Sequence, residues 1–182
     1  MGTGTVGMAR TVVLRQTGAV LIPVAVWALC VLALADAVVE GTPTFAVRVG
    51  VVASAVAWAV WVGLASPCMV VERAGLRIIN PLRTHWVPYG ALDEVRVRGL
   101  TSVTARHVSG RLRSITSWNA PGVPLRYTAA APPVATVIEH FRSDWEQRST
   151  GDTEALATTS WRWRPALALL ALVAASIAIW LR

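Results

Sequence analysis

The sequence predicts an α+β membrane protein, with three transmembrane helices and a bent antiparallel β-sheet or barrel capped by a C-terminal helix. Of its 182 residues, 54% are hydrophobic and only 15% are charged, whereas about 25% charged is typical of soluble domains. The apolar residues are concentrated in three long runs, and a polar island of short alternating segments lies between the second and the third. Long apolar runs predict helices that cross a bilayer, and short alternating segments predict strands.

Residues 18–66 are expected to form a transmembrane helical hairpin, after a flexible cytoplasmic tail over residues 1–17. The first apolar run, residues 18–39, would reach about 33 Å as a helix, which is longer than the apolar core of a cleaved signal peptide. A polar turn leads to the second run, residues 45–65, with Arg48 near its start. A long side chain at that place can reach the membrane interface, and an ion path through Arg48 is the weaker alternative.

Residues 67–147 predict an α+β domain. Short runs of alternating apolar and polar residues are separated by turn signals such as Asn80-Pro81, which predicts an antiparallel sheet. Beyond Pro132-Pro133, apolar residues recur at helical spacing, so an amphipathic helix closes the domain. The stripe of that helix comprises Val134, Val137, Ile138, Phe141 and Trp145.

Residues 148–164 are expected to be a flexible linker, because they are polar and lack apolar periodicity, and residues 165–182 a third transmembrane helix. Tryptophans and arginines precede the last apolar run and Trp180 closes it, as membrane interfaces favour. Arginines in the tail and in the island flank the spans. The positive-inside rule then predicts a multi-pass protein of the inner (cytoplasmic) membrane, with the N-terminus and the domain in the cytoplasm and the C-terminus outside.

One stretch of the island carries a family pattern. It runs from Met69 to Glu72, continues from Gly75 to His85, and ends with Val87-Pro88-Tyr89 and Leu92. This stretch resembles the PH-like (pleckstrin-homology-like) domains of actinobacterial membrane proteins, with Tyr89 where tryptophan is usual. The resemblance implies a seven-stranded, strongly bent sheet capped at one end by the helix, and no catalytic residue.

The sequence indicates no catalytic, cofactor-binding or metal-binding residue. His85, His107 and His140 are far apart and share no ligand spacing, and Cys30 and Cys68 form no CxxC pair. No serine stands in a nucleophile-elbow context. We therefore expect a protein that is not an enzyme and that uses no cofactor.

Arginine supplies all the basic side chains and a net charge of +7. Arg96 and Arg98 are two residues apart on one predicted strand, and Arg111 and Arg113 on another, so each pair projects from one face. These four arginines are the candidate contacts with lipid headgroups or with a partner. The alternative is a solvated strand face that only helps to orient the protein.

The function we expect is that of a non-catalytic module that recruits or organises partner proteins at the cytoplasmic membrane face. The alternatives are anionic-lipid sensing by the basic sheet face and an accessory subunit of a membrane transport or secretion complex. The expected partners are the lipid bilayer and a protein that the sequence does not identify, and homo- or hetero-oligomers through the transmembrane helices are left open. Nucleic acid is not expected, because Trp86, Trp118 and Tyr127, like Leu92, are predicted to fill the core and not an exposed groove.

Overall fold

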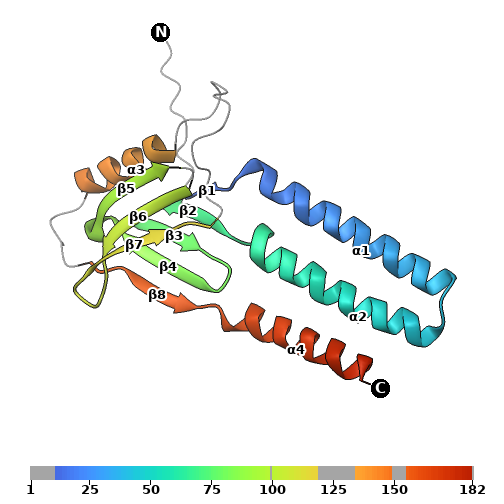
Figure 1. Ribbon diagram of the computed structural model, residues 1–182. Helices are drawn as coiled ribbons and strands as arrows, with labels where there is room; N and C mark the ends of the chain where they lie inside the picture. The colour runs from blue at the N-terminus through green and yellow to red at the C-terminus, as the bar shows by residue number, and fades with distance from the viewer. Residues whose placement is uncertain (1–10, 99, 119–133, 149–154, 182) are drawn as a thin grey trace, which may run out of the picture.

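The computed structural model describes residues 11–98, 100–118, 134–148 and 155–181 (Figure 1). It combines helices with antiparallel sheets, as predicted. The helices are α1 (Leu21–Val39), α2 (Pro43–Val60), α3 (Val134–Arg148) and α4 (Trp163–Trp180), with short turns η1 (Thr17–Val20), η2 (Trp61–Ala65) and η3 (Tyr89–Ala91). The strands are β1 (Thr11–Leu14), β2 (Cys68–Glu72), β3 (Gly75–Ile79), β4 (Arg83–Pro88), β5 (Leu92–Arg98), β6 (Leu100–Arg106), β7 (Leu112–Thr116) and β8 (Thr158–Trp161).

Three helical segments are long and apolar enough to cross a membrane: Gly18–Val39, Pro43–Ala65 and Trp163–Trp180. Figure 1 shows α1, α2 and α4 extending side by side from one end of the sheets, with α2 in contact with both neighbours. Very few of their residues are fully buried, as expected of helices that lipid surrounds.

Tryptophan side chains join these helices to one another. The Trp27 indole N–H donates to the Ala57 carbonyl of α2 at 3.1 Å, and the Trp58 indole N–H donates to the Pro165 carbonyl at the start of α4, also at 3.1 Å. Near the far end of the bundle, the Arg48 guanidinium carbon lies 5.4 Å from the centroid of a Trp180 ring. That is cation–π distance, so Arg48 is tied to α4.

The strands form two antiparallel sheets, one ordered β1-β2-β3-β4-β8 and the other β5-β6-β7. Successive side chains along a strand point to opposite faces, so every second residue meets the facing sheet. Helix α3 packs against β2 and β5 with its predicted apolar stripe, which is confirmed. The fully buried core comprises Met69, Val71, Leu76, Ile78, Val87, Val103, Ala105, Ile138 and Ala157.

Two segments expected to be flexible contain strands. Residues 11–14 of the expected tail form β1, which pairs with β2, so the α1–α2 hairpin is inserted between neighbouring strands of one sheet. Residues 158–161 of the expected linker form β8, which pairs with β4. Both predictions are wrong there, because the edges of β2 and β4 supply backbone hydrogen-bonding partners that are distant in sequence. The remaining parts of these predictions, residues 1–10 and 149–154, lie outside the described residues.

The predicted core tryptophans are not in the core. Trp86 is only half-buried and lies opposite Arg77, whose guanidinium carbon is 5.7 Å from its ring centroid, and Trp118 is 59% exposed. The register of β4 directs Val87 inward and therefore its neighbour Trp86 outward. Leu92 is buried, as predicted. Tyr127 and the expected helix start at residues 132–133 lie outside the described residues.

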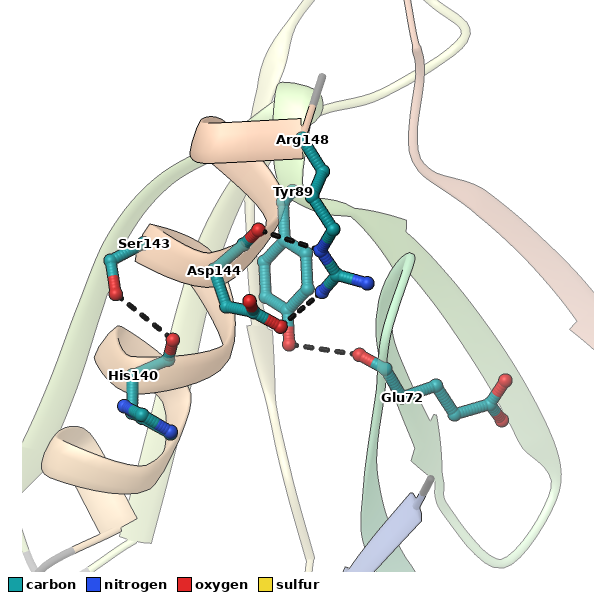
Figure 2. Close-up of polar contacts among 6 residues, drawn as sticks. All are labelled: Glu72, Tyr89, His140, Ser143, Asp144 and Arg148. Carbon is teal, nitrogen blue, oxygen red and sulfur yellow. Dashed lines mark hydrogen bonds and ion pairs between the residues drawn. The ribbon is translucent and has the colours of Figure 1, made fainter. Parts of the chain in front are cut away.

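Tyr89 anchors α3 to the sheet (Figure 2). Its ring lies 6.1 Å from that of Trp145, and its hydroxyl donates to the Glu72 carbonyl at 3.0 Å. Burial, and then the nearby Glu72 carboxylate, raise the pKa of Tyr89 above its usual value. On the exposed side of α3, Arg148 pairs with Asp144 one turn earlier. The Tyr89 hydroxyl and the Asp144 carboxylate thus each have a partner close by.

Candidate anion-binding groove

An open groove of about 580 Å³ lies between β4 and β8 of one sheet and β7 of the other. In Figure 1, β8 runs along the side of the domain opposite α3 and leads directly into α4. One wall consists of Asn80, Pro81, Leu82, Arg83, His85, Thr159 and Trp161, and the other of Arg113, Ser114, Ile115, Thr116 and Trp118. We call this space the groove.

The groove continues the inner faces of the two sheets. On β4, Val87 is buried in the core, and His85 and Arg83 follow at two-residue spacing on the same face. On β7, Ile115 is buried and Arg113 lies two residues before it. The positions that carry apolar side chains in the core therefore carry cations or a histidine in the groove.

Among the described residues, no carboxylate pairs with either of the two groove arginines. The ion pairs found there involve Arg77, Arg96, Arg142 and Arg148, and no described Asp or Glu lines the groove. The Arg83 guanidinium carbon lies 4.1 Å from the centroid of a Trp161 ring, so a cation–π contact positions it. Arginine presents five N–H donors, and both side chains are therefore able to bind an anion.

His85 belongs to a chain of polar contacts along the floor of the groove. Its Nδ1 lies 2.9 Å from Thr159 Oγ1, which in turn lies 3.5 Å from His107 Nε2. Burial is the largest cause that lowers the pKa of His85, and electrostatic interactions with Arg83, His107 and Arg113 lower it further. His85 is therefore neutral at physiological pH.

Asn80 holds the two walls together at one end. Its side-chain Nδ2 donates to the Thr116 carbonyl at 3.0 Å, and its Oδ1 accepts from the Trp118 backbone N–H at 2.9 Å. The predicted turn at Asn80-Pro81 is confirmed by a bond from Asn80 N–H to the Arg83 carbonyl at 2.8 Å. The Asn80 side chain thus bridges the sheets, a role that the turn prediction did not include.

The same end of the groove adjoins the long apolar helices. Arg162, between β8 and α4, donates from Nη1 to Ser66 Oγ at 3.0 Å and to the Asn80 carbonyl at 3.2 Å. Its backbone N–H donates to the Leu82 carbonyl at 2.9 Å. Arg162 therefore ties together the exit of α2, the β3–β4 turn and the entry to α4, and the groove opens beside them.

Of the predicted contact arginines whose side chains the structure describes, Arg113 alone lines the groove. Arg96 pairs with Glu94, with 2.8 Å between Nη2 and a carboxylate oxygen, and the hydrogen bond to Glu94 raises the pKa of Arg96. Arg111 is exposed in the turn before β7. Arg98 is the last residue of β5, and its side chain is not among those that the structure describes. The prediction missed Arg83 and His85, although their two-residue spacing from Val87 was a usable signal.

In the described residues, no cluster of three or more His, Cys, Asp or Glu side chains is placed to hold a metal ion. No family model matches the chain, and neither the curated proteins nor the solved structures provide a match. The chemistry of the groove is therefore the basis for assigning a function.

Proposed function

We propose that the protein is a non-catalytic, membrane-anchored module that binds anionic lipid headgroups in the groove. In this proposal α1, α2 and α4 cross the cytoplasmic membrane, with the N-terminus and the domain in the cytoplasm and the C-terminus outside. The observation that carries the proposal is that Arg83 and Arg113, from different sheets, line one groove, and that no Asp or Glu is among the described residues that line it.

A PH-like fold is part of the proposal. The first four strands belong to one antiparallel sheet and the next three to the other, and α3 follows them. That order supports the seven strands and capping helix that the resemblance implies. Strand β8 is an addition to this plan, and it supplies Thr159 and Trp161 to the groove.

The place of the groove favours a lipid over a protein partner. Leu82, Trp118 and Trp161 at its rim are each about half exposed, and tryptophan is enriched at membrane interfaces. The contacts of Arg162 keep this rim beside the entry to α4. An arginine close to an anionic bilayer surface contributes about 1 kcal/mol, and a structured groove adds hydrogen bonds to that attraction.

The test uses the full chain, delipidated in detergent and offered phosphatidylglycerol and phosphatidylcholine with identical acyl chains. Native mass spectrometry counts the bound lipids. We expect the wild type to prefer phosphatidylglycerol. In the Arg83→Gln/Arg113→Gln double variant that preference should fall, by about tenfold for each of the two arginines, because a hydrogen bond to a charged group contributes about 1.5–3 kcal/mol.

The matched control is the Arg73→Gln/Arg106→Gln double variant, which removes the same charge from exposed positions outside the groove. Equal losses in the two double variants would show that diffuse charge suffices and would refute the proposal. A wild-type chain without any preference for the anionic lipid would also refute it. A protein that copurifies with the wild type and is lost only in the groove variant would favour partner recruitment instead.

A further inference from the structure

The chemistry of the groove indicates a narrower ligand class, an inference that rests on the function proposed above. We infer that the groove binds a phosphate monoester, held by Arg83 and Arg113 from opposite walls and by the Nε2–H group of a neutral His85. The terminal phosphate belongs either to a lipid headgroup or to a soluble metabolite, and the two sources share this chemistry.

The formal charge of the groove matches that of a phosphate monoester. With His85 neutral, the two arginines give the described lining of the groove a formal charge of +2, and no carboxylate in that lining reduces it. A phosphate monoester carries about −1.5 to −2 at neutral pH, whereas a phosphodiester carries a single negative charge. The monoester therefore neutralises the groove, and the diester leaves the charge of one guanidinium uncompensated.

The number of hydrogen-bond donors in the groove also matches the oxygens of a phosphate monoester. Each guanidinium offers a planar fork suited to two phosphate oxygens, and the forks come from opposite walls. Hydroxyl groups of Ser114 and Thr116 also line the groove. A monoester presents three unesterified oxygens, which is enough to engage both walls and His85 together. A diester presents only two.

The hydrogen-bond partners of His85 determine which of its ring nitrogens carries the proton. The Ser109 backbone N–H donates to His107 Nδ1 at 3.3 Å, so Nδ1 is an acceptor and the ring proton lies on Nε2. That N–H faces Thr159 Oγ1, and the Thr159 hydroxyl in turn donates to His85 Nδ1. His85 then carries its own proton on Nε2, for which no described residue provides a partner. The chain of contacts thus prepares an N–H donor for a ligand.

The surroundings of His85 keep this donor uncharged. It is flanked by Arg83 on β4, Arg113 on β7 and His107 after β6, and the groove residues of β8, Thr159 and Trp161, are uncharged. A proton added to Nδ1 would also face the hydroxyl hydrogen of Thr159 and reverse the whole chain of donors. Thr159 and His107 are therefore positioning residues, and His85 is the contact.

The tautomer is directly measurable, because the chain contains three histidines. In the full chain labelled with ¹⁵N-histidine and reconstituted in bilayers, solid-state NMR should show His85 neutral with its proton on Nε2. His107→Gln and His140→Gln variants assign the signals. Thr159→Val should populate both tautomers of His85. A wild-type His85 that is cationic, or protonated on Nδ1, would contradict the inference.

The ligand class is tested by offering the delipidated full chain equal amounts of dioleoyl phosphatidic acid, a monoester, and dioleoyl phosphatidylglycerol, a diester. Native mass spectrometry near neutral pH should show about a tenfold preference for phosphatidic acid, since one further hydrogen bond to a charged group is made. His85→Leu should reduce that preference, leaving the part that comes from the charge of the two arginines, and His85→Gln should retain most of it because its amide can place an N–H near the position of Nε2.

Glycerol 3-phosphate separates the two sources of the phosphate. If it displaces phosphatidic acid at comparable concentration, the monoester ligand is soluble, and if it does not, the ligand is a lipid headgroup. Equal binding of the two lipids, with both lost in the Arg83→Gln/Arg113→Gln variant, would overturn the monoester inference and leave the proposed function standing. Absence of binding by either lipid would overturn both.

Discussion

The space between the two sheets is a packed core in one half and an open groove in the other, although the same strands line both halves. Strand β4 contributes Val87 to the core but His85 and Arg83 to the groove, and β7 contributes Ile115 and then Arg113. Helix α3 covers the first half, and none of the described residues cover the second. The alternation of side chains along a strand decides which way each one faces. The residue type at the inward positions then decides whether that half of the space between the sheets is a packed core or an open groove.

Substitutions in the packed half should have the largest effect on the stability of the protein. Ile78→Ala, at a fully buried position, should lower the free energy of unfolding by about 2–5 kcal/mol, since it deletes packed apolar volume. Leu82→Ala, at the groove rim, should change it by less than about 0.5 kcal/mol. Chemical denaturation of the full chain in detergent, followed by tryptophan fluorescence, measures both. Similar losses for the two variants would mean that the groove half is packed as well.

The contact between β3 and β4 is the next test, because β4 serves both halves. A Cβ at Gly75 would lie 2.4 Å from the Val87 carbonyl oxygen and 2.8 Å from Pro88 Cα. Gly75→Ala should therefore cost about 1–3 kcal/mol and displace β4, with weaker lipid binding as a result. Thermal unfolding of the full chain measures the loss of stability. The control in that assay is Gly63→Ala, where no atom lies within 4 Å of the new Cβ, and this variant should leave the lipid binding unchanged.

Asn80 tests whether the walls of the groove need a bridge. Asn80→Ala removes the bonds to the Thr116 carbonyl and the Trp118 N–H and should cost about 1–3 kcal/mol. Asn80→Asp keeps the acceptor for Trp118 and should lose less. Hydrogen–deuterium exchange should be faster at the end of β7 in the alanine variant and unchanged in β2. Faster exchange throughout both sheets would show that the bridge stabilises the whole domain and not the groove alone.

Tyr89 gives the smallest effect and confines it to the core half. Tyr89→Phe loses the bond to the Glu72 carbonyl and should cost about 1 kcal/mol, without change in lipid binding. Because the pKa of Tyr89 is raised in the folded state, the unfolded chain ionises first as the pH rises past the usual tyrosine value of about 10. Wild-type stability should therefore fall above that pH, and the phenylalanine variant should lose less. Urea denaturation on both sides of that value checks the sign.

Local patterns were sufficient to predict the long apolar helices and the stripe of α3, because each depends on neighbouring residues. They were insufficient for β1 and β8. The inward positions near β8 are Ala157 and Thr159, which give no apolar alternation, and the strand forms because β4 presents a free edge that is distant in sequence.

The groove was predictable only in part, and for a related reason. Arg113 was selected as a candidate contact, whereas Arg83 and His85 were not. The sequence predicts that Trp86 of β4 points into the core. Because neighbouring residues of a strand point to opposite faces, that prediction places His85 and Val87 on the outer face. The pairing of Leu76 with Val87 decides the question, and that pairing is a property of the folded sheet.

The central claim is that anions bind in the groove and not over a diffuse basic face. Arg113 and Arg111 test it most directly, because they are two residues apart and only Arg113 lines the groove. Native mass spectrometry of the full chain with phosphatidic acid should show about a tenfold loss of binding for Arg113→Gln, which corresponds to about 1.4 kcal/mol, and less than about a twofold loss for Arg111→Gln. Equal losses for the two variants would contradict the account.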